Sequence, residues 1–142
     1  MTSPKLIQEF RPRYFIKIKG NTATFLWSSS PDTPLKSSVD LKVKRHLTEV
    51  LWLAKNMGCS VNKDIVVIHN LDVYNRLIIY AWVRSTLRDP KAAKRLALLV
   101  MDINSWDALY WASRLRELYW NREGYSKRLK LAKAFKLFFG LE

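Results

Sequence analysis

The last quarter of the chain mixes cationic side chains with aromatic rings. Between Ser105 and Glu142, eight Lys and Arg residues are interspersed with nine Phe, Tyr and Trp residues. Cations bind phosphate oxygens, and aromatic rings stack on nucleobases. At helical spacing, the two together predict a surface that holds phosphate while a ring meets a base or a ribose. The pattern indicates a class of ligand and does not identify a reaction.

A second set of candidate ligands lies earlier, in an apolar segment. Arg76, Tyr80 and Arg84 are four residues apart and therefore lie along one side of a helix, and Asn75 adds an amide beside Arg76. An arginine in an apolar helix requires a partner. The Arg76 guanidinium is therefore expected either to form an ion pair or to bind two phosphate oxygens at once. For Arg84 we expect the ion pair. Three acids are candidate partners for these arginines: Asp72, Asp102 and Asp107.

The two C-terminal helices are expected to carry the remaining candidates. On the helix that begins at Ser105, one face is predicted to hold Tyr110, Arg114, Glu117 and Asn121. Most of its tryptophans are expected to pack in the core. Trp120 is the exception, since it adjoins Asn121, Arg122 and the break at Gly124. On the last helix, a lysine recurs at every third position, whereas an apolar set is expected to pack inward. The lysines are Lys127, Lys130, Lys133 and Lys136, and the apolar set is Leu129, Ala132, Phe135 and Phe138.

The overall charge favours a polyanionic partner. The 142 residues contain 25 Lys and Arg against 12 Asp and Glu, a formal net charge of +13. Such an excess predicts long-range attraction to nucleic acid or nucleotides that salt weakens. Networks of ion pairs on the protein surface are an alternative explanation for many charged residues, but they would require similar numbers of acidic and basic residues. No apolar run is long enough to span a bilayer, so no membrane partner is expected.

The sequence gives little support for catalysis or for a cofactor. Cys59 is the only cysteine, so we expect a reducing, cytoplasmic environment and neither a multi-cysteine zinc site nor an iron–sulfur cluster. The two histidines, His46 and His69, have no metal-binding spacing and no obvious nucleophile beside them. The four glycines do not form a phosphate loop. We therefore predict a noncatalytic binding protein with no metal.

The predicted fold is mainly α within the α+β class. Alternation over residues 14–19 and 22–27 around Gly20 and Asn21 predicts a β-hairpin, followed by a loop at residues 28–34. Helical spacing is then expected from about Val39 to Gly58, and residues 65–68 fit either a strand or a buried turn. Four further helices are predicted, over about 72–87, 90–101, 105–122 and 125–138. We thus expect one domain over residues 1–142, with the hairpin and loop in 1–38 and a helical bundle in 39–142.

Residues 75–139 resemble a known family. The sequence Asn75-Arg76-Leu77-Ile78-Ile79-Tyr80 matches a first arm that places basic residues ahead of a tyrosine. A second arm matches Trp111, Arg114, Tyr119-Trp120 and the run Gly124-Tyr125-Ser126-Lys127-Arg128. The segment is similar to the C-terminal domain of the primase large subunit, and more so to its reduced relative, the accessory subunits of archaeal primases (the PriX family). The large-subunit domain holds an iron–sulfur cluster on four cysteines, which this chain lacks. The N-terminal hairpin is not matched.

The resemblance implies a specific role in DNA replication. It implies a noncatalytic subunit that joins the primase small and large subunits, and that binds the nucleotide triphosphate or the 5′ end of the primer on its DNA template. Under this hypothesis, phosphate contacts are made by Arg76, Arg114, Arg122, Lys127 and Arg128. The base or the ribose is bordered by Asn75, Tyr80 and Trp120.

Two alternatives remain open from the residues alone. The residues also fit a general DNA- or RNA-binding protein, such as the small helical subunit of a nucleic-acid-guided (CRISPR-type) defence complex. It is also compatible with an adaptor whose exposed aromatic rings contact another protein. The edges of the hairpin are expected to be its partner surface, through strand addition.

Overall fold

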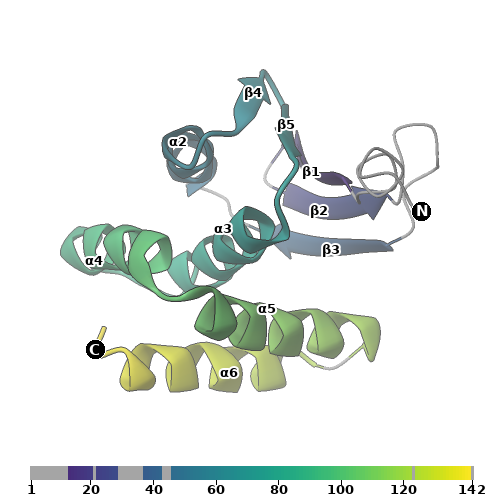
Figure 1. Ribbon diagram of the computed structural model, residues 1–142. Helices are drawn as coiled ribbons and strands as arrows, with labels where there is room; N and C mark the ends of the chain where they lie inside the picture. Colours follow the sequence, from purple (N-terminus) through teal and green to yellow (C-terminus); the bar gives the residue numbers. More distant parts are fainter. Residues whose placement is uncertain (1–12, 21, 29–36, 43–45, 123, 142) are drawn as a thin grey trace, which may run out of the picture.

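An antiparallel β-sheet with helices on one face forms the framework of the molecule (Figure 1). The computed structural model describes residues 13–20, 22–28, 37–42, 46–122 and 124–141, and the loop predicted at residues 28–34 falls almost entirely outside these ranges. The described part contains the expected hairpin and five helices, so the α+β prediction is confirmed.

The predicted hairpin is formed by β1 (Arg13–Lys19) and β2 (Thr22–Ser28). Tyr14, Ile16 and Ile18 point into the core, as their period of two requires. The register pairs Lys19 with Thr22 across the turn. Gly20 in that turn has a φ of +59°, a left-handed conformation that glycine adopts without steric strain.

Three more strands extend the hairpin into a five-stranded sheet. They are β3 (Ser37–Lys42), β4 (Ser60–Asn62) and β5 (Ile65–Ile68), and the order across the sheet is β3-β2-β1-β5-β4. Residues 65–68, which fitted either a strand or a turn, therefore form a strand beside β1. Because β3 and β5 flank the hairpin, its two edges are already paired. The expectation that those edges accept a partner strand is therefore wrong for this sheet.

The first helix begins later than the sequence predicts. Val39 lies in β3 opposite Phe25, and helix α2 covers only Leu47–Asn56. Val39 and Leu41 are buried and alternate with exposed Ser38 and Asp40. Because Val39 is four residues from Val43, this strand alternation also fitted a helical spacing. Val43 itself lies outside the described residues.

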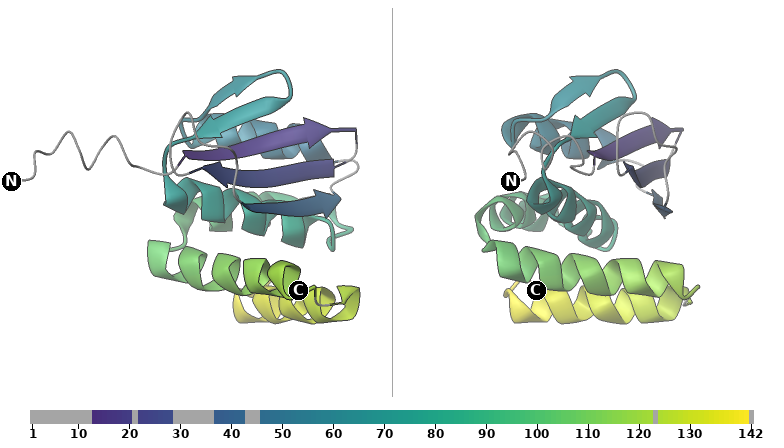
Figure 2. Two further views of the ribbon diagram at one scale, coloured as in Figure 1. Left: turned by 90° about the vertical axis from the view of Figure 1, so that its right-hand side faces the viewer. Right: turned by 45° about the vertical axis from the view of Figure 1, so that its right-hand side comes forward.

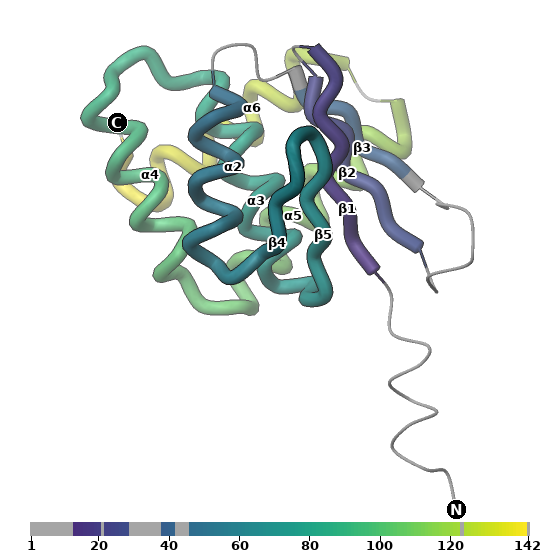
Figure 3. Tube along the Cα trace, turned by 90° about the horizontal axis from the view of Figure 1, so that it is seen from above, coloured from purple at the N-terminus to yellow at the C-terminus, as the bar shows by residue number. Residues whose placement is uncertain are grey.

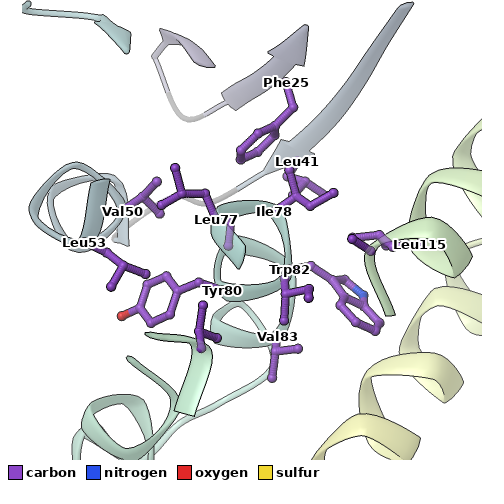
Figure 4. Close-up of a cluster of buried hydrophobic side chains, with 14 of the residues drawn as sticks. Phe25, Leu41, Val50, Leu53, Leu77, Ile78, Tyr80, Trp82, Val83 and Leu115 are labelled. Carbon is purple, nitrogen blue, oxygen red and sulfur yellow. The ribbon is translucent and has the colours of Figure 1, made fainter. Parts of the chain in front are cut away.

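Helix α3 (Leu71–Arg84) forms the centre of the molecule. Each residue from Tyr74 to Arg84 is buried, which confirms the predicted central helix. Figure 4 shows its side chains directed toward the sheet, toward α2 and toward the C-terminal helices. The helix is capped by Asn70, whose side chain accepts a 2.8 Å hydrogen bond from the Asp72 amide, and not by Asp72 as predicted.

The last three helices follow the predicted order. They are α4 (Pro90–Asp102), α5 (Ser105–Trp120) and α6 (Tyr125–Phe138). Asp89 caps α4 ahead of Pro90, as its position predicted. For α5 the cap is Asn104, one residue before the predicted Ser105. Helices α5 and α6 run side by side as a hairpin on the side of α3 away from β1 and β5 (Figures 1 and 2).

Candidate functional site

The turn between α5 and α6 gathers cations and aromatic rings that are separate in the sequence. Helix α5 ends at Trp120, and the Arg122 amide donates a 3.2 Å hydrogen bond to the Tyr119 carbonyl oxygen. Arg122 itself has a φ of +53°, which reverses the chain direction. Gly124 is the N-cap of α6, and its carbonyl oxygen accepts a hydrogen bond from the Lys127 amide. The two helix ends are therefore fixed beside each other.

Arg128 is held against aromatic rings at this turn. Its guanidinium carbon lies 4.4 Å from the ring centroid of Tyr119 and 5.8 Å from that of Tyr125. Distances below about 6 Å indicate a cation–π contact. The Arg128 Nε atom is buried and has no hydrogen-bond partner among the described residues. Burial raises the pKa of the Tyr119 hydroxyl, whereas the neighbouring Arg128 acts in the opposite direction.

Two large rings at this turn are exposed. Trp120 is 56% exposed and Tyr125 is 68% exposed. The side chains of Arg122 and Lys127 are also exposed at this turn. A surface with this composition can stack on a base and attract phosphate at the same time. We call the set Tyr119, Trp120, Arg122, Tyr125, Lys127 and Arg128 the turn site.

The face of α5 that leads to this site has the predicted composition. Tyr110, Arg114, Glu117 and Asn121 are all exposed, as their spacing indicated. The guanidinium carbon of Arg114 lies 5.6 Å from the ring centroid of Tyr110, one helical turn away. Arg114 lies nearer the middle of α5, and its side of the helix is about 140° away from that of Tyr119.

The flanking aromatic residues differ partly from the prediction. Trp111 is buried against Phe135, with 5.3 Å between the ring centroids. Trp106 is 81% exposed and Phe138 is 70% exposed, although both were expected in the core. Phe138 is the last residue of α6 and Trp106 is in the first turn of α5, so each has few neighbouring residues to cover it.

The lysines of α6 do not form one row. Each step of three residues rotates by about 300° around the helix axis, which is about 60° short of a full turn. Three such steps place the first and the fourth lysine on opposite sides of the helix. Lys127, Lys130 and Lys133 are exposed, whereas Lys136 is buried. For the same reason Leu129 is partly exposed, and the buried stripe contains Leu131, Ala132 and Phe135. The cations available for the turn site are therefore those of the first two turns.

The residues of the predicted first arm form hydrogen bonds with residues outside the turn site. Arg76 is buried, and its Nε donates a 2.8 Å hydrogen bond to an Asp72 carboxylate oxygen. Its Nη1 donates another, also of 2.8 Å, to the carbonyl oxygen of Val100 on α4. Of the two interpretations for Arg76, the ion pair is the one observed.

Tyr80 and Arg84 face α2, away from the C-terminal hairpin. The Tyr80 hydroxyl donates a 2.7 Å hydrogen bond to Glu49, and the Arg84 Nε donates another of 2.7 Å to the same carboxylate oxygen. The Glu49 partner was not among the acids expected for Arg84. Figure 4 shows Tyr80 and Trp82 on opposite sides of α3. The Trp82 indole N–H donates to the Arg128 carbonyl oxygen, so only the Trp82 side of α3 meets the turn site.

The Glu49 carboxylate is the centre of this small network. Partial burial opposes its ionisation, but hydrogen bonds from Arg84 and Tyr80 outweigh that effect and hold its pKa below the usual value. Burial and the hydrogen bond to Glu49 raise the pKa of the Tyr80 hydroxyl. These groups stabilise each other, and this arrangement gives Tyr80 and Arg84 a structural role.

Asn75 contacts a residue that the sequence did not single out. Its side-chain oxygen accepts a 2.6 Å hydrogen bond from Nη1 of Arg116 on α5, and Nη2 of Arg116 donates to Ser113. Burial raises the pKa of the adjacent Tyr74 to about 12, although Arg116 opposes that rise. In the sequence, the only sign that Arg116 would contact α3 was its position next to Leu115, a residue with the apolar spacing of a buried helix face. Asn75 therefore joins α3 to α5 and lies away from the exposed rings.

The two predicted arms are thus not brought into one pocket. Arg76 faces α4, and Arg128 faces Tyr119 and Tyr125. Of the eight predicted site residues, the turn site contains Trp120, Arg122, Lys127 and Arg128. Arg114 lies on α5 outside the turn site, and Asn75, Arg76 and Tyr80 are buried.

Within the described ranges, no group of three His, Cys, Asp or Glu residues is placed to hold a metal ion. None of the described helices is long and apolar enough to cross a membrane. Burial raises the pKa of the single thiol, Cys59. Comparison of the chain with protein-family models, with curated proteins and with solved structures gave no match.

Proposed function

We propose that this chain is a noncatalytic nucleic-acid-binding protein that holds a single strand at the turn site. The observation that carries the proposal is the exposure of Trp120 and Tyr125 beside Arg122, Lys127 and Arg128. Exposed rings offer stacking surfaces to unpaired bases. The bases of a duplex are already stacked on one another and are not available to these rings. The net charge of +13 supports a polyanionic partner over an acidic small molecule.

The geometry of Arg128 supports the same ligand. The ring contacts hold the guanidinium plane in place, and the buried Nε leaves the two terminal nitrogens as the donors that can reach a phosphate. A guanidinium presents two parallel N–H donors to two phosphate oxygens. Trp120 and Tyr125 would then stack on the neighbouring bases.

A binding titration with matched variants tests the proposal. We expect Trp120→Ala and Arg122→Gln to weaken binding of a fluorescent single-stranded oligonucleotide, with the loss of stacking alone worth about 1–3 kcal/mol. Trp106→Ala is the control, because Trp106 is a more exposed tryptophan of the same helix, about 21 Å away along its axis. Equal loss from Trp106→Ala and Trp120→Ala, or no loss from either, would contradict the proposal.

The primase role that the resemblance implies is a narrower form of this proposal. In that form the turn site, which holds most of the second arm, contacts the 5′-triphosphate that begins a primer, and the chain assembles with the primase small and large subunits. Arg122, Lys127 and Arg128 supply several cations within one turn, as a triphosphate requires.

A single chemical difference tests the narrower form. Two oligonucleotides of one sequence, one with a 5′-triphosphate and one with a 5′-hydroxyl, are compared for binding, with ATP and AMP as competitors. Preference for the triphosphate, lost in Arg128→Ala, is expected for the primase role. Equal affinity for both ends would rule out the primase role and leave the general nucleic-acid-binding proposal in place.

A further inference from the structure

The outer face of the β-sheet is a second surface that combines cations with apolar side chains. Because side chains alternate along a strand, Phe15, Lys17 and Lys19 of β1 point to the face opposite the buried Ile16 and Ile18. Lys17 and Lys19 are exposed. Helices α2, α3 and α4 lie on the other side of the strands (Figure 3).

An apolar row crosses the sheet at Phe15. The register places Leu26 of β2 and Val67 of β5 on either side of this ring. All three side chains are only partly buried. The next row along the strands places Thr24 and Ile65 beside Lys17. The face therefore offers an apolar centre for bases and adjacent cations for phosphates.

This face leads directly to the turn site. Strand β3 is the edge of the sheet nearest α5, and α5 contacts it (Figures 1 and 2). Asp40 of β3 is exposed and pairs with Thr24, so it extends the row that contains Lys17. The Asp40 carboxylate also acts electrostatically on the Tyr119 hydroxyl of the turn site. The row therefore runs from Lys17 over Thr24 to Asp40, on the strand that contacts α5.

We propose that the outer face of the sheet and the turn site form one continuous track for a single nucleic-acid strand, which crosses β3 between them. The inference rests on the nucleic-acid-binding function proposed above and extends it from one site to a path. Neighbouring strands lie about 4.8 Å apart, so β1 and β3 are separated by about 10 Å, which an extended strand of a few nucleotides can cross. Asp40 is the only acid on the β1–β2–β3 part of this path among the described residues, and its charge opposes phosphate there.

Oligonucleotide length separates the track from the turn site alone. Two lengths are compared, one of about 4 nucleotides and one of about 12 nucleotides, which bracket typical single-strand site sizes. The double variant Lys17→Gln/Lys19→Gln is expected to weaken binding of the long strand only. It should also reduce the slope of log affinity against log salt by about 1.4, since each phosphate contact on a single strand contributes about 0.7. The double variant Lys91→Gln/Lys94→Gln, at two exposed lysines of α4, is the charge-matched control.

Asp40→Asn gives the test of opposite sign. Removal of the opposing charge should strengthen binding of the long strand by roughly threefold at low salt, and should change binding of the short strand by a smaller factor. Asp102→Asn, an exposed carboxylate on α4, is the matched control. Thermal unfolding of each variant, expected within about 2 °C of the parent because these side chains are exposed, checks the fold.

The outcomes distinguish the two proposals. If Trp120→Ala weakens both lengths while the sheet variants bind like the parent, the track is wrong and the turn site stands. If the double lysine variant weakens both lengths equally and Asp40→Asn has no effect, the sheet is a separate site and the track is again wrong. If no variant of either surface changes binding, the proposed function itself fails.

Discussion

The guanidinium carbon of Arg128 lies 4.4 Å from the centroid of the Tyr119 ring, closer than any other cation–ring pair in the described part of the chain. The contact joins the first turn of α6 to the last turn of α5. It fixes the orientation of a cation that would otherwise rotate freely on a long side chain. The turn site therefore presents a guanidinium in one direction, against the rings of Tyr119 and Tyr125.

Arg128→Lys is expected to weaken binding although the charge is kept. An ammonium group has no plane to lie on the Tyr119 ring and cannot bind two phosphate oxygens in parallel. We expect the Kd for a single-stranded oligonucleotide to rise about fivefold in a fluorescence titration. Arg122→Lys is the control, because exposed Arg122 contributes charge and contacts no ring among the described residues. Its affinity should remain within about twofold of the parent. Equal effects of the two substitutions would show that the ring contact does not matter for binding.

Arg76→Met is expected to destabilise the fold without changing nucleic-acid binding. The substitution leaves the Asp72 carboxylate and the Val100 carbonyl oxygen without their donor, and we expect a loss of about 2–3 kcal/mol in the free energy of unfolding. Urea unfolding measures the loss, and binding is measured on protein that remains folded. Asp72→Asn should produce a smaller loss of the same kind. A large loss of affinity in stable Arg76→Met protein would mean that the first arm binds nucleic acid after all.

Glu49→Gln is expected to destabilise the protein in a pH-dependent way. The folded-state pKa of Glu49 lies below its ordinary value of 4.5, so its ionised form stabilises the fold. That contribution is complete above the unfolded-state pKa and is lost as pH falls through the lower folded-state pKa. Because the Glu49 side chain is 39% exposed, we expect a modest loss of about 1–2 kcal/mol at pH 7.

Unfolding free energies from pH 7 to pH 3 measure this effect. The difference between the parent and Glu49→Gln should remain constant down to about pH 5 and then diminish toward pH 3. Thr48→Ala, at the exposed neighbouring position, serves as the control and should show no such dependence. A difference that stays constant to pH 3 would mean that the charge of Glu49 contributes nothing to stability.

The sequence alone determined several of the local elements of this protein. Strand alternation located β1 and β2, the Asp89–Pro90 pair located the start of α4, and Gly124 located the break before α6. Each of these signals acts through residues a few positions apart, so it is visible in the order of the chain. The nearly continuous apolar composition of α3 likewise predicted that it would be the central helix.

Only the tertiary structure decided which of the cations share a surface. Arg76 and Arg128 are equally basic in the sequence, but the rotation of α3 turns Arg76 toward Asp72 and Val100, whereas Arg128 meets Tyr119 and Tyr125. The same holds for the sheet, where Asp40 and Lys17 come together through β2 although they are far apart in the chain. Helix packing and strand register depend on contacts between distant residues, and a local pattern carries no information about those contacts.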